Sequence, residues 1–79
     1  MLTIGFISPY ERDFRIFKYN NTMHKIIHIN HDKDRFRGVE FDLIICGENW
    51  KLVDDIIVNH AYLRIIKLNQ IKENEIQNK

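Results

Sequence analysis

The sequence predicts a small α/β domain in which a short, mainly parallel sheet of three or four strands is covered by helices in two or three layers. The main observation is the segment 41–46, in which nearly every side chain is apolar. A strand that is apolar on both faces is typical of a parallel sheet buried by helices. The second observation is that strand-like and helical patterns alternate along the chain, as βαβ units require.

Residues 2–7 are apolar at most positions and predict the first strand. A helix start follows at once, with Ser8 as the N-cap, Pro9 at the first helical position and Glu11 completing a capping box. Helical spacing continues beyond this start and aligns one apolar stripe, and the paired asparagines at 20–21 end the helix. The stripe consists of Tyr10, Phe14 and Phe17.

Residues 24–30 predict a second strand, and residues 40–46 predict a third. The polar stretch between them, 31–37, predicts one or two helical turns with Gly38 as the residue that ends them. We expect Cys46, at the end of the third strand, to be a buried, reduced thiol.

The last part of the chain allows two interpretations. In the interpretation that we favour, Asn49 caps a final helix that runs to about residue 64. In the other, the helix breaks at 59–60 and residues 62–68 form a fourth strand rich in β-branched side chains. Residues 1–69 then make one α/β domain, and the polar residues 70–79 make a C-terminal tail.

Right-handed crossovers and a central first strand give the strand order 2-1-3. The carboxyl ends of strands one and three then lie side by side, so residues 8–12 and 47–50 share one crevice. Open α/β sheets bind their ligands in such a crevice. We expect a partner or ligand to contact seven residues there: Tyr10, Arg12, Arg35, Arg37, Glu48, Asn49 and Trp50.

Trp50 has two interpretations that remain open from the residues alone. Tryptophan is enriched at binding hot spots, because a large apolar ring carries one polar group. Alternatively, Trp50 packs over the first helix as part of the core while Asn49 serves as an N-cap. The two roles are compatible.

The sequence lacks the residue patterns that several kinds of chemistry require. Glycine occurs only at positions 5, 38 and 47, so no phosphate-binding glycine-rich loop is present. The four histidines (24, 28, 31 and 60) have no cysteine or carboxylate at metal-ligand spacing. Asp42 is expected to pair with Arg37 or to accept a bond from a backbone amide rather than act as a base. We therefore expect neither an enzyme nor a cofactor.

The charge pattern and hydropathy limit the partners. The net charge is +1 and acidic residues are interleaved with the basic ones, which makes nucleic acid an unlikely partner. No long apolar run occurs, so no membrane span is expected. A single cysteine and no signal-peptide pattern fit a cytoplasmic protein, in the host cytoplasm if the chain is phage-encoded.

The segment 37–45, Arg-Gly-Val-Glu-Phe-Asp-Leu-Ile-Ile, resembles the strand that precedes the acidic Walker B pair in phage terminase and helicase ATPases. Cys46 and Gly47 stand where that pair would be, so ATP hydrolysis is not implied. About two thirds of the chain also resembles small uncharacterised proteins of tailed phages. The residues that carry this second resemblance are Ser8-Pro9, Arg12-Asp13-Phe14, Arg37-Gly38, Phe41-Asp42, Gly47 and Trp50.

The phage resemblance implies a Rossmann-like minidomain that binds and modulates a host or defence protein, as an inhibitor of anti-defence type. We also expect exposed sheet edges, which make a homodimer plausible. One alternative is a minidomain that binds a nucleotide or a signalling dinucleotide in the same crevice. The other is an accessory factor that binds nucleic acid.

Overall fold

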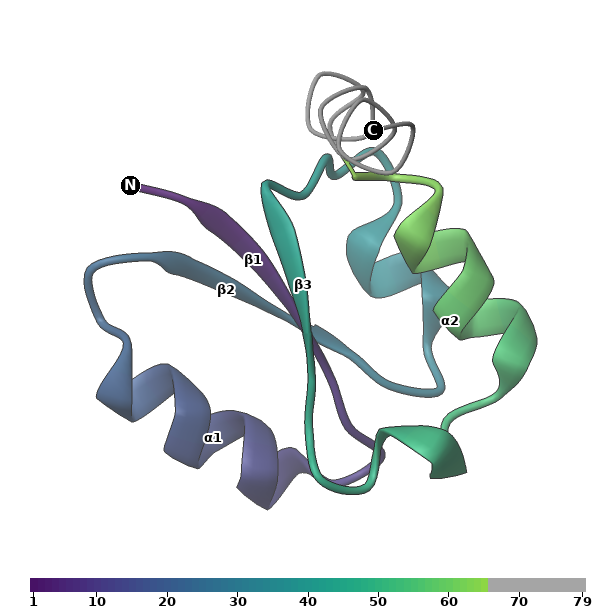
Figure 1. Ribbon diagram of the computed structural model, residues 1–79, viewed down its shortest axis with the longest axis horizontal. Coiled ribbons are helices and arrows are strands. Elements are labelled where there is room, and N and C mark those ends of the chain that lie inside the picture. The colour runs from purple at the N-terminus through teal and green to yellow at the C-terminus, as the bar shows by residue number, and fades with distance from the viewer. Residues whose placement is uncertain (66–79) are drawn as a thin grey trace, which may run out of the picture.

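The computed structural model describes residues 1–65, which form the predicted small α/β fold. A three-stranded, wholly parallel sheet has the order β2-β1-β3, as expected from the sequence (Figure 1). The strands are β1 (Thr3–Ile7), β2 (Lys25–Ile29) and β3 (Leu43–Cys46). The helices are α1 (Glu11–Asn20) and α2 (Asp55–Tyr62), and the short 3-10 helices are η1 (Lys33–Phe36) and η2 (Trp50–Leu52).

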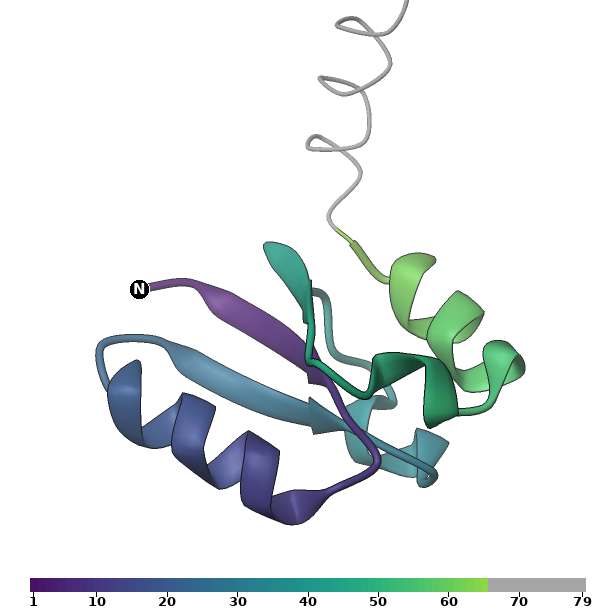
Figure 2. The ribbon, with the colours of Figure 1, turned by 60° about the horizontal axis from the view of Figure 1, so that its bottom comes forward.

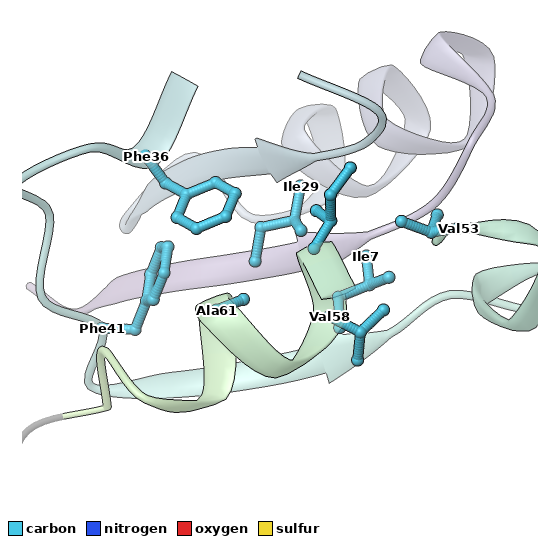
Figure 3. Close-up of a cluster of buried hydrophobic side chains, with 8 residues drawn as sticks. Ile7, Ile29, Phe36, Phe41, Val53, Val58 and Ala61 are labelled. Atoms are coloured by element: carbon cyan, nitrogen blue, oxygen red, sulfur yellow. The ribbon is translucent and has the colours of Figure 1, made fainter. Parts of the chain in front are cut away.

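The sheet is the middle of three layers. Helix α1 lies against one face, whereas α2 and η1 lie against the other (Figures 1 and 2). Side chains alternate along each strand, so β1 sends Ile4 and Phe6 toward α1 and Ile7 toward α2. The larger core is on the α2 side and is drawn in Figure 3; its buried members are Ile7, Ile29, Phe36, Phe41, Val53, Ile57, Val58 and Ala61.

The start of α1 differs from the prediction. Tyr10 occupies the N-cap position and makes no side-chain cap, so Ser8 lies two residues too early to cap the helix. Ser8 belongs to the end of the sheet instead, because its amide donates to the carbonyl of Ile29 at 3.1 Å. Its hydroxyl accepts a hydrogen bond from the Tyr10 amide at 3.1 Å and so fixes the turn into the helix.

Strand β3 is less buried than its apolar sequence predicts. It forms one edge of the sheet, so Leu43, Ile44 and Ile45 are only half-buried. The expectation of a buried thiol is wrong, because Cys46 is exposed at the end of this edge strand. The Cys46 sulfur lies 3.3 Å from the Tyr62 hydroxyl, and this hydrogen bond is the main cause that raises the pKa of Tyr62.

The segment after β3 is not one long helix that begins at Asn49. Asn49 precedes η2 and makes no side-chain cap, and α2 starts only after Asp54, whose carboxylate accepts from the Ile56 amide at 2.8 Å. Helix α2 continues through positions 59–60 and ends at Tyr62, short of residue 64.

The proposed fourth strand is represented by one parallel bridge between Phe41 and Ile65. Residues 66–68, the domain boundary at 69 and the tail 70–79 lie outside the described residues.

Two smaller expectations are confirmed. The stretch 31–37 contains the short helix η1, and Gly38 follows it with a φ of 74°, a left-handed conformation that favours glycine. The Asp42 carboxylate accepts a hydrogen bond from the Thr3 amide at 2.7 Å, so it binds a backbone amide at the amino end of β1.

Candidate functional site

A small polar cluster lies where β1 and β3 end side by side. The register aligns Ile7 with Cys46, and the Gly47 amide donates to the Ile7 carbonyl at 2.9 Å. Asp13, in the first turn of α1, accepts a hydrogen bond from the Ser8 hydroxyl at 3.3 Å. The Asn49 amide nitrogen donates to the same carboxylate oxygen at 3.5 Å. Asp13 therefore connects the two loops that follow β1 and β3.

A groove adjoins this cluster on the α1 side of the sheet. It has a volume of about 290 Å³. Its apolar part includes the rings of Phe6 and Phe17, which stack with centroids 4.6 Å apart, and Ile16, whose exposed fraction is 52%. Two carboxylates also line it, so an apolar surface borders on negative charge. The full lining is Phe6, Asp13, Ile16, Phe17, Asn20, Asn21 and Glu48.

Two of the seven predicted contact residues are connected to this groove by direct contacts. Glu48 lines it, and Asn49 bonds to Asp13, which also lines it. Tyr10 and Arg12 are exposed at the start of α1, and neither is among the described residues that line the groove. The sequence thus identified the loops that form one end of the site. It did not predict that Ile16 and the asparagines at 20–21 line the groove. Which α1 side chains border the groove depends on how the helix is placed across the sheet, and the sequence pattern does not give this placement.

Trp50 lies on the other face of the sheet. Its ring is half-buried against the α2-side core, and the Lys51 ammonium lies 5.9 Å from the ring centroid. The core interpretation of Trp50 therefore describes its contacts, although with the α2-side core rather than with α1. The loop 47–50 crosses the end of the sheet, since Glu48 faces the groove and Trp50 faces α2.

Arg35 and Arg37 do not line the groove. Both are exposed, and Arg37 forms an ion pair with Asp34 at 3.5 Å. Arg37 lines a separate hollow together with side chains near the end of α2, His60 and Arg64. The structure therefore does not bring the seven predicted contact residues together at one place.

His28 is a buried polar group between the sheet and α1 that the sequence did not single out as buried. Its exposed fraction is 2%, and its ring stacks on Phe14 with centroids 4.5 Å apart. Nε2 donates to the Ser8 carbonyl at 2.8 Å, whereas Nδ1 is buried and has no hydrogen-bond partner within residues 1–65. Burial lowers the pKa of His28, and this effect outweighs the Ser8 hydrogen bond, which acts in the opposite direction. The alternation of β2 side chains could have indicated that position 28 faces α1.

We expect stability to fall as the pH is lowered below about 6.5, the ordinary histidine pKa. The unfolded chain binds a proton at His28 more readily than the folded one does, so the free energy of unfolding is largest above that pH. It decreases by at most about 1.4 kcal/mol per pH unit for one group until the pH passes the folded pKa. Urea denaturation followed by circular dichroism at several pH values measures this slope. His28→Phe should flatten it, whereas His31→Gln, at an exposed histidine, should not.

The described residues offer little for catalysis or metal binding. No group of three potential metal-ligating side chains occurs within residues 1–65. The Ser8 side chain is fully buried, and His28 binds the Ser8 carbonyl rather than its hydroxyl, so this pair is not an activated nucleophile. None of the described helices is long and apolar enough to cross a membrane.

No protein-family model matches the chain, and no curated protein or solved structure matches it either. Function is therefore inferred from the groove, the charges around it and the exposed side chains.

Proposed function

We propose that this protein is a non-enzymatic binding module whose groove beside α1 receives an apolar side chain of a protein partner. The observation that supports this function best is the groove itself, in which the half-exposed Ile16 lies beside the stacked rings of Phe6 and Phe17. An apolar hollow with a polar rim is the usual form of a pocket for a hot-spot residue.

The charges around the groove support a second feature of the proposed partner, a basic side chain. Asp13 and Glu48 are the charged residues of its lining, and both carry carboxylates. On the same helix as Asp13, Arg15 is paired with Glu11 at 3.0 Å. A partner segment that carries an apolar side chain next to a lysine or arginine would complement both the shape and the charge of the groove.

The phage resemblance in the sequence makes a host or defence protein our proposed partner, with inhibition as the proposed effect. A homodimer is a second proposal of the same class. Strands β2 and β3 each have one edge that pairs with no other strand of the described sheet, and such edges favour association.

The test is affinity capture with two matched variants. Ile16→Gln places a polar side chain in the groove, whereas Ile56→Gln makes the same change on the exposed surface of α2, where Ile56 has an exposed fraction of 64%. We expect Ile16→Gln to lower the amount of captured partner roughly tenfold or more, as at a hot spot, and Ile56→Gln to retain it. The readout is quantitative mass spectrometry of proteins bound to the tagged chain.

A reversal of charge, Glu48→Lys, provides the second arm. It should weaken the same complex and make its remaining affinity less sensitive to salt. The proposal fails if both glutamine variants capture the partner equally well, or if both lose it equally. Circular dichroism of each variant establishes that the fold is intact.

A further inference from the structure

A second hollow, separate from the groove, lies between η1 and the end of α2. It has a volume of about 160 Å³ and is on the α2 side of the sheet. The buried ring of Phe36 forms part of its wall, and the remaining lining is polar. The lining consists of Asp34, Phe36, Arg37, His60 and Arg64.

Positive charge prevails in this hollow. Among the described lining residues, Arg37 and Arg64 bring two guanidinium groups that stay protonated at any physiological pH, against one carboxylate from Asp34. The Asp34–Arg37 ion pair is long, at 3.5 Å, and both side chains are exposed, so it constrains the arginine only weakly. His60 adds an imidazole that can donate a further hydrogen bond.

The end of a helix normally disfavours anions, because its last carbonyl groups are free acceptors. At the end of α2 three of these carbonyls accept hydrogen bonds. Those of Asn59, Ala61 and Tyr62 accept from the amides of the next residues of the chain, 63–65. The Arg64 carbonyl accepts from the Phe41 amide at 2.9 Å. These hydrogen bonds reduce the number of free acceptors at this helix end that would disfavour an anion.

We propose that this hollow is a binding site for a tetrahedral oxyanion, specifically the phosphoryl group of a small phosphate ester. Guanidinium groups bind phosphate oxygens through paired, charge-assisted hydrogen bonds. The volume is below the range of about 300–1,000 Å³ that is usual for whole small-molecule sites, so the hollow takes the phosphoryl group and leaves the rest of the molecule outside. Phe36 is buried and offers no ring face for a nucleobase.

Titration of the ¹⁵N-labelled protein by NMR tests the site directly. The probes are inorganic phosphate, AMP and acetate, added at constant ionic strength with chloride as the balancing ion. We expect phosphate and AMP to shift the amides of Arg37, His60 and Arg64 with similar affinities, and acetate to bind more weakly. Equal affinity for phosphate and AMP would show that only the phosphoryl group is recognised. Shifts confined to the loop 47–50 would instead place the anion in the crevice and overturn the proposal.

Variants separate the site from a general effect of charge. Arg64→Gln should weaken phosphate binding roughly tenfold or more, because it removes a charge-assisted pair of hydrogen bonds. Arg15→Gln makes the same change in net charge on α1, where Arg15 pairs with Glu11, and should leave the affinity unchanged. The proposal is wrong if phosphate causes no shifts that chloride does not cause, or if the two variants bind phosphate equally. Amide dispersion in the spectra of the variants reports whether each one is folded.

Discussion

Phe41→Ala is expected to remove about 3–5 kcal/mol from the free energy of unfolding, the usual cost of truncating a buried phenylalanine. Phe41 is fully buried and its ring contacts that of Phe36, with centroids 6.1 Å apart (Figure 3). A domain of this length is typically stable by only about 4–12 kcal/mol. The loss is therefore a quarter or more of the stability of the domain, and it unfolds the variant if the wild-type chain lies at the lower end of that range.

Urea denaturation monitored by circular dichroism and by the fluorescence of Trp50, the single tryptophan, measures this loss. Tyr19→Ala is the control, since Tyr19 has an exposed fraction of 83% and should change stability by less than about 0.5 kcal/mol. Equal losses for the two variants would mean that Phe41 does not lie at the centre of the core. Phe41→Leu should recover much of the stability, because it refills most of the cavity.

Gly47→Ala is expected to have the second largest effect, lowering the free energy of unfolding by about 1–3 kcal/mol. It should also displace the loop that borders the groove. A Cβ atom at position 47 would lie 2.8 Å from the Ile7 carbonyl oxygen and 2.8 Å from the Phe6 ring. The carbonyl belongs to the central strand and cannot move aside, so the loop must shift. Glu48 and Asn49 follow directly and would move with it.

The control for this variant is Gly38→Asn. Glycine is favoured at position 38 because φ there is 74°, and asparagine tolerates this φ better than most residues. A Cβ atom at this position would have no atom within 4 Å. We expect Gly38→Asn to cost less than Gly47→Ala and to leave the amide shifts of residues 47–49 unchanged. A stable Gly47→Ala protein with unchanged shifts at those residues would contradict the tight contact with β1.

The strand order and the meeting of β1 with β3 were predictable because they depend on hydrophobic runs and on the handedness of crossovers. A hydrophobic run can be read from a short piece of sequence, and the handedness of crossovers is the same in almost all parallel sheets. The prediction failed where a residue forms its hydrogen bonds with a neighbouring strand rather than with the helix that follows it in the sequence. Ser8 has the residue type of an N-cap, yet its amide is bound by Ile29, twenty-one residues later in the chain.

The same physical reason explains Cys46 and Trp50. An apolar strand is buried on both faces only if helices reach it, and β3 lies at an edge where Cys46 remains exposed. Trp50 was expected to share a crevice with Tyr10, but the turn at η2 sends its ring to the α2-side core. The second hollow depends on Arg37 and Arg64, which are far apart in sequence and lie at the same hollow only after α2 has folded back.

The groove and the second hollow lie on opposite faces of one thin sheet. The described residues that line them do not overlap, so the anion and the partner that we propose would contact different side chains. Strand β2 connects the two sides, because it contacts α1 on one face and η1 and α2 on the other. If the two proposed sites influence each other, thermodynamic reciprocity requires the anion to change the affinity for the partner by the same factor by which the partner changes the affinity for the anion.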